Sequence, residues 1–170
     1  LMPSLVASIV AFAVFGSVEG FTPIFGFHTG FTFQEPAQLG WYALLGVTAG
    51  LMGRLYAHTF YGVSDAFRRM PLHRTIKPAV AGFAVGLIGL LIPGVLGTGY
   101  GAVQEALDRT LLLEMPLWMV LLLPLAKTLA TSLSIGSGGS GGIFGPGMVI
   151  GGATGAALWR LLEPVAPAMP

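Results

Sequence analysis

The sequence predicts an all-α integral membrane protein, a multi-helix bundle with a broken, non-spanning helix pair around a glycine-rich loop. Three observations predict this fold class. Hydrophobic residues make up 54% of the 170 residues, and the mean hydropathy is +0.81. Charged residues make up only 9%, whereas soluble domains carry about 25%. The few charges are clustered, and the stretches between them have the length of membrane-spanning helices.

The charge-free stretches define the expected helices. They comprise residues 1–18, 36–53, 78–104 and 128–159. An apolar helix needs about 20 residues to cross a hydrocarbon layer of ~30 Å. Pro93-Gly94 is expected to end one helix, and a glycine-rich break precedes the last one. We expect one short helix that does not span and five others; in order, the ranges are 3–17, 37–70, 76–92, 101–109 (the short one), 116–135 and 144–162.

The start of the chain and its basic residues predict that it is a fragment and how it is oriented in the membrane. The chain begins with Leu1 and has no basic residue before its first apolar stretch, so this stretch is not expected to be a signal peptide. We expect residues 1–170 to be a single fragment of a longer, multi-pass protein of a plasma or inner membrane. The connection at 54–77 is expected to be cytoplasmic, because basic residues favour that side; it contains Arg54, Arg68, Arg69, Arg74 and Lys77.

Several functional classes are disfavoured. The net charge of +1 provides no basic stripe for nucleic acid. There are no cysteines, and the histidines (His28, His58 and His73) lie far apart, so no metal site or other cofactor is expected. No catalytic residue is expected either, and the protein is predicted not to be an enzyme.

The glycine-rich loop is the candidate functional segment. Residues 136–142 carry two hydroxyls, Ser137 and Ser140, and no acid or histidine. Irregular backbone at membrane depth has to be buried in protein or to line a wet cavity. A helix beginning near Phe144 presents unpaired N–H groups and about half a positive charge, and Pro146 suits its first turn. These features predict an anion site made of partial charges. The alternative is a tight turn between helices with no ligand.

A second interpretation makes Ser140 a nucleophile. The run Gly138–Gly142 matches the G-x-S-x-G pattern of hydrolases, and its Gly-x-Ser-Gly part resembles the nucleophile of rhomboid-type intramembrane serine proteases. Both require a later histidine, and none follows His73. A serine-reactive fluorophosphonate probe discriminates this hypothesis from an anion site.

The same loop resembles a segment of the CLC family of chloride channels and chloride/proton exchangers. Its core Gly142-Ile143-Phe144-Gly145-Pro146 is similar to the family's third selectivity-filter motif, G-x-F-x-P. The flanking segments, which resemble the family's flanking helices, are 87–101, 125–131 and 149–155. The resemblance covers essentially the whole chain and implies part of a CLC-type inverted-repeat fold.

The resemblance also implies specific roles. The backbone N–H groups of Ile143 and Phe144 would coordinate chloride in a voltage-gated-type chloride channel or a chloride/proton antiporter. Gly145 stands where an alanine is common. The supporting loop before the motif comprises Gly136, Ser137, Gly138, Gly139, Ser140 and Gly141. The gating glutamate, the other filter segments and any regulatory domains would lie outside this chain, in the rest of the subunit.

Partners follow from the same resemblance. We expect a homodimer in which the first helix contributes to the contact between subunits. The other expected partners are membrane lipid and a small anion such as chloride, and no nucleic acid is expected. Lys127 lies in the helix before the loop, where it is expected to reach an interface, to pair with a neighbour, or to draw anions toward the pore.

Overall fold

The computed structural model describes residues 2–21, 36 and 38–164. All regular structure in these residues is helical, so the predicted all-α class is confirmed. The chain divides into two compact units, residues 1–30 and 31–170, and each is described by itself.

The first unit contains one helix, α1 (Met2–Glu19). Its 18 residues are mostly apolar and almost all exposed. Gly16 is the buried exception, because the ring of Phe21 lies over it: a Cβ on Gly16 would come 2.3 Å from Cε1 of Phe21. Glycine therefore allows the chain to fold back at the end of this helix.

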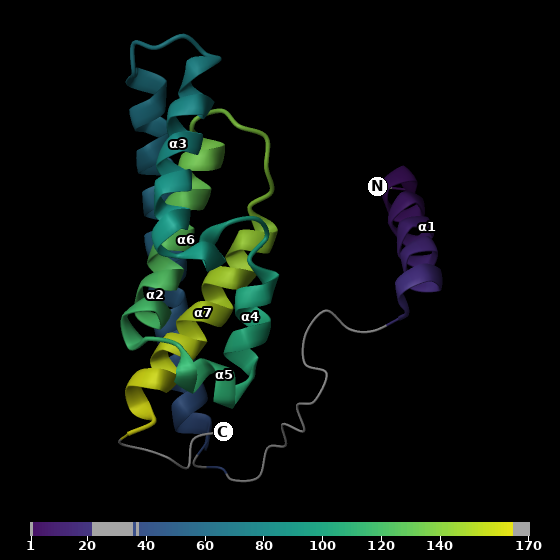
Figure 1. The fold of residues 1–170 in the computed structure, drawn as a ribbon, viewed down its shortest axis with the longest axis vertical. Coiled ribbons are helices and arrows are strands. Elements are labelled where there is room, and N and C mark those ends of the chain that lie inside the picture. The colour runs from purple at the N-terminus through teal and green to yellow at the C-terminus, as the bar shows by residue number, and fades with distance from the viewer. Residues whose placement is uncertain (1, 22–35, 37, 165–170) are drawn as a thin grey trace. The chain divides into compact units, whose positions relative to one another are not determined.

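The second unit is a bundle of long helices with short helices on one flank (Figure 1). The central helix is α6, which packs against α2, α3 and α7 and has more buried residues than any other described helix. The elements are α2 (Gln38–Arg69), α3 (Ile76–Leu91), the 3-10 turn η1 (Pro93–Val95), α4 (Tyr100–Leu107), α5 (Arg109–Glu114), α6 (Leu117–Gly136) and α7 (Phe144–Leu162).

Small residues let the helices of the bundle approach closely. Gly136, the last residue of α6, lies against α2, where a Cβ would come 2.9 Å from Oγ of Ser64. Gly152 of α7 lies against Val103 of α4, where a Cβ would come 3.3 Å from Cγ1. Ala130 of α6 belongs to the apolar core, together with Ile92, Val95, Leu123 and Ala153.

Two expected ranges need correction. Residues 54–69 of the expected 54–77 connection belong to α2, which runs for 32 residues and lies within the helix range expected at 37–70. The connection itself is residues 70–75, and Lys77 at the start of α3 donates to the carbonyl of Phe67 at 2.5 Å. Apolar residues of the long helix continue past Arg54, so a charge inside a helix does not end it.

The second correction concerns the short helix expected at 101–109. The chain forms two helices here, because Asp108 is extended and caps α5. Its carboxylate accepts the N–H of Thr110 at 2.9 Å and that of Leu111 at 3.3 Å. The rule that aspartate favours a helix N-terminus identifies this break in the sequence.

Two of the described helices, α1 and α6, are long and apolar enough to cross a membrane. A third apolar helix, α3, is shorter, with 16 residues. Backbone carbonyls at the end of α6 bond to Ser137 and Gly138, which close the helix with a tight turn.

Candidate functional site

The loop between α6 and α7 depends on glycine at defined positions. Gly138 has φ +98°, a left-handed conformation that residues with a side chain rarely adopt. At Gly139 a Cβ would come 2.4 Å from the carbonyl oxygen of Ser134, and at Gly141 it would come 3.2 Å from Ile135. At Gly142 it would meet nothing within 4 Å in the described residues. Glycine is therefore needed for its backbone conformation at Gly138 and for lack of space at Gly139 and Gly141, whereas Gly142 faces open space.

The backbone N–H groups of this loop form a row of free donors. The N–H groups of Ser137 and Gly138 bond to carbonyls of α6. From Gly139 to Gly145, no N–H donates to an acceptor among the described residues. Ile143 caps α7 with φ −91° and ψ −17°, and its carbonyl accepts the N–H of Gly147 at 3.1 Å. The free donors therefore lead directly into the positive end of a 19-residue helix.

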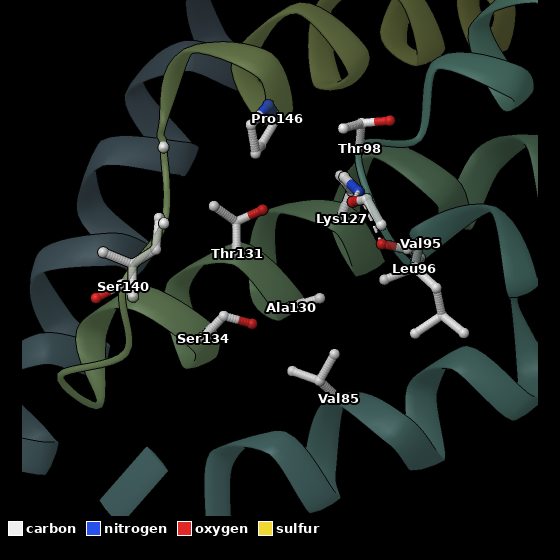
Figure 2. A pocket seen from close by; sticks show the side chains of 14 residues that line it. Val85, Val95, Leu96, Thr98, Lys127, Ala130, Thr131, Ser134, Ser140 and Pro146 are labelled. Carbon is white, nitrogen blue, oxygen red and sulfur yellow. Dashed lines mark hydrogen bonds between the residues drawn. The ribbon is translucent and has the colours of Figure 1, made fainter.

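A pocket of about 290 Å³ lies against this loop (Figure 2). The loop and the start of α7 form one wall, and Figure 2 shows Ser140 and Pro146 on that side. The turn after α3 forms the opposite wall, with Thr98 and Leu96, and α6 lies between the two. The remaining lining residues are Val85, Val95, Gly97, Lys127, Ala130, Thr131, Ser134, Ile135, Gly141 and Gly142.

Lys127 is buried beside this pocket. Its side chain is 2% exposed, and its ammonium donates to the carbonyl oxygens of Val95 at 2.7 Å and Gly97 at 2.8 Å. No carboxylate in the described part of the chain pairs with it. Of the expected outcomes, pairing with a neighbour is the one observed, and the neighbours are backbone carbonyls. Burying an ammonium is costly unless such hydrogen bonds compensate for lost water.

The structure separates the predicted loop residues into three groups. Gly142 and Pro146, together with Ser140 and Gly141, line the pocket. Ile143, Phe144 and Gly145 do not line this pocket, and the side chains of Ile143 and Phe144 are 57% and 81% exposed.

The other predicted loop residues have structural contacts. Ser137 is buried, and its hydroxyl donates to the carbonyl of Ser134 at 3.1 Å. Gly136 contacts α2, while Gly138 and Gly139 shape the turn. These four residues, expected together as a supporting loop, are thus held by separate contacts or turn conformations.

Several lining residues were not among the expected site residues, including Thr98, Thr131, Ser134 and Gly97, which supplies a carbonyl to Lys127. The spacing of Lys127, Thr131 and Ser134 by four and three residues places them on one face of α6, and this spacing was the available signal. Histidine is absent from the lining of the pocket that contains Ser140. Among the described residues there is also no cluster of metal-ligating side chains.

Comparisons with known proteins agree on one family. The sequence profile of the family described as "Voltage gated chloride channel" matches residues 1–170. The chain is 29% identical to chloride channel protein CLC-f of Arabidopsis thaliana over 161 residues, which are 92% of this chain and 20% of that protein. It is 38% identical over 107 residues to the voltage-gated ClC-type chloride channel ClcB of Citrobacter koseri, covering 62% and 24%.

A third relative is ClcB of Escherichia coli O9:H4, 37% identical over 125 residues, which are 71% of this chain and 29% of the relative. The chain thus spans less than a third of the length of these relatives. No solved structure matches it.

Proposed function

This chain belongs to the voltage-gated chloride channel family, and from that membership and the geometry of the loop we propose that it forms one wall of an anion pathway. The transported ion is chloride or a similar small anion, and the complete protein is a channel or a chloride/proton antiporter. The relatives extend well beyond the matched segment, so the other walls of the pathway belong to further segments of the subunit.

The observation that supports this proposal is the row of free donors from Gly139 to Gly145. Residues 140–144 are exposed and Gly139 and Gly145 are half-buried, so these N–H groups are open to an external acceptor, and one anion can accept several of them at once. The donors nearest the start of α7 are those of Ile143 and Phe144, where the helix adds its partial positive charge. We therefore propose these two N–H groups as the chloride ligands of this chain, within the motif that ends at Pro146.

The chemistry of the site suits transport. Conduction requires an ion to bind favourably and to leave readily. Backbone dipoles provide attraction without a full charge in direct contact. The nearby full charge, on Lys127, is held by the carbonyls of Val95 and Gly97. It contributes to the potential of the pocket from a fixed position, and this is the role in anion attraction that we propose for it.

The arrangement does not support the hydrolase alternative. A serine nucleophile needs a base within hydrogen-bond reach. Ser140 lines a pocket whose lining contains no histidine, carboxylate or tyrosine, and the ammonium of Lys127 in that lining bonds to the carbonyls of Val95 and Gly97 and not to Ser140. A fluorophosphonate probe is therefore expected to leave Ser140 unlabelled, and specific labelling would reopen the hydrolase interpretation.

The remaining assignments are proposals of the same kind. The complete protein is proposed to be a multi-pass homodimer in lipid, with the 70–75 connection and its basic neighbours on the cytoplasmic side. Five positively charged residues between Arg54 and Lys77 support this orientation through the positive-inside rule.

The test is chloride efflux from liposomes that contain the complete protein, with internal pH recorded at the same time. Efflux with stoichiometric proton movement identifies an antiporter, and efflux alone identifies a channel. Absence of anion flux from folded protein contradicts the proposal.

A matched pair of variants locates the site. Gly142→Val adds a branched side chain where a Cβ meets nothing in the described residues, so folding is expected to persist while flux or anion selectivity changes. Gly53→Val on α2 also adds bulk where a Cβ meets nothing, away from the loop, and is expected to leave both unchanged. Equal behaviour of the two variants contradicts the placement of the site at this loop.

A further inference from the structure

The turn that joins α3 to α4 is held against the helix that carries the proposed anion site. It contains η1 and two glycines in the left-handed conformation, Gly97 with φ +59° and Gly99 with φ +81°. The ammonium of Lys127 bonds to two carbonyls of this turn, those of Val95 and Gly97. These charge-assisted hydrogen bonds fix the turn to α6.

The same turn also contacts α7. A Cβ on Gly99 would come 3.1 Å from Cγ1 of Val149 and 3.1 Å from Nζ of Lys127. Val149 is completely buried, one turn into α7. A residue with a side chain at position 99 would separate the turn from both helices, so glycine is required here both by φ and by space.

The residue that follows, Tyr100, reaches the first turn of α7. A Cβ on Gly145 would come 3.3 Å from the hydroxyl oxygen of Tyr100 and 3.9 Å from Cζ. Gly145 is the second residue of α7, directly after Phe144. The phenol therefore occupies the space that a side chain at position 145 would need.

We propose that Tyr100 is a positioning residue for the anion site, and that Gly145 is its complementary partner. The turn pinned by Lys127 holds Tyr100 in place, and its phenol sets how closely the first turn of α7 approaches the pocket. The N–H groups of Ile143 and Phe144 lie at that end of the helix, so their position depends on this contact. This inference rests on the proposed anion-binding function.

A double-mutant cycle in the complete protein tests the pair. Gly145→Ala places a methyl 3.3 Å from the Tyr100 hydroxyl, tighter than an ordinary contact, so the first turn of α7 and Tyr100 have to part by a few tenths of an ångström. Tyr100→Phe removes the hydroxyl and leaves room for the methyl. The measurements are the chloride dissociation constant by calorimetry, the chloride/nitrate permeability ratio in liposomes, and Tm.

Gly145→Ala alone is expected to weaken chloride binding by at least about threefold, the lower range of coupling between contacting residues. It is also expected to change the permeability ratio. In the double variant, chloride affinity is expected to return to within about twofold of that of Tyr100→Phe. The control is Gly147→Ala, on the same helix, where a Cβ meets nothing within 4 Å of the described residues.

Three results overturn the inference. The first is that the double variant binds chloride as weakly as Gly145→Ala. The second is that the cycle shows coupling in Tm but none in affinity or permeability, which identifies a purely structural contact. The third is that Gly147→Ala has the same effect as Gly145→Ala. Failure of the unmodified protein to bind chloride refutes the proposed function itself, and this positioning role with it.

Discussion

The Gly139→Ala variant tests the geometry of the loop most directly. The added methyl would lie 2.4 Å from the carbonyl oxygen of Ser134, whereas ordinary contacts begin at 3.4 Å, so the two groups must part by about 1 Å. The obstacle is backbone in the last turn of α6, which has no alternative rotamer. Forcing extra atoms into a packed site of this kind typically costs about 1–3 kcal/mol.

The assay is thermal unfolding of the complete protein in detergent, with Gly142→Ala as the control. Position 142 lies three residues further along the loop, and a methyl there meets nothing within 4 Å in the described residues. Gly139→Ala is expected to lower Tm by several degrees relative to Gly142→Ala, and to weaken chloride binding because the row of N–H donors begins at position 139. Equal Tm values for the two variants would show that the loop does not pass this close to α6, and would refute the reasoning.

Three further predictions concern other parts of the second unit. Hydrogen bonds from the side chain of Thr110, and then from two backbone N–H groups, hold the pKa of the Asp108 carboxyl below its usual range. The stability that the ionised carboxyl contributes is therefore complete above pH ~4 and is lost as the pH falls further. The Tm difference between the unmodified protein and Asp108→Asn should accordingly shrink below pH ~4. A Tm difference that stays constant down to pH 2 contradicts it. Gly136→Ala should lower Tm, since a Cβ would come 2.9 Å from Oγ of Ser64 on α2 and 3.2 and 3.3 Å from its backbone N and Cα. A second substitution, Ser64→Gly, removes only the hydroxyl contact and should restore part of the loss; no recovery refutes that contact. Lys127→Met leaves two carbonyls without a donor, and each unsatisfied carbonyl costs about 1–3 kcal/mol. The substitution should therefore lower both Tm and chloride flux. Unchanged chloride affinity and flux would exclude any role for this ammonium in attracting anions.

The fold class followed from simple quantities in the sequence, because lipid imposes few solutions on the backbone. Clustered charges and long apolar stretches predicted a helical bundle, and the helical class is what the structure shows. One helix was expected at 37–70, and α2 (Gln38–Arg69) lies in this range, so the basic residues from Arg54 to Arg69 belong to a helix and not to a connection. The break at Asp108, which divides the helix expected at 101–109, was not predicted.

Close helix contacts were not predictable from glycine spacing alone. The four-residue spacing of Gly46 and Gly50 is typical of a packed helix face, but a Cβ at either position meets nothing within 4 Å in the described residues. Gly136 and Gly152, which do make close contacts, have a serine or an alanine, and not a second glycine, at four-residue spacing. Which glycine faces a neighbour depends on the rotation of each helix, and this is a property of the packed bundle.

The candidate site was partly predictable for a similar reason. A run of glycines before a proline at the start of a helix indicates free N–H donors, and the structure leaves the donors from Gly139 to Gly145 without acceptors in its described part. The opposite wall of the pocket comes from the turn at 95–98, some 40 residues earlier in the chain. No local pattern connects Thr98 or Gly97 to the loop, so three-dimensional packing alone brings them together.

The row of free donors has a consequence for the time that an ion spends at the site. When the ion leaves, the N–H groups from Gly139 to Gly145 have no acceptor in the described chain, so water has to take its place. In the proposed pathway, each transfer is then an exchange of N–H hydrogen bonds to an anion for N–H hydrogen bonds to water. We expect the vacant state of the proposed site to be hydrated rather than empty, so that water offsets part of the cost of releasing the ion. A substitution that dries this loop would therefore slow ion release as well as weaken ion capture.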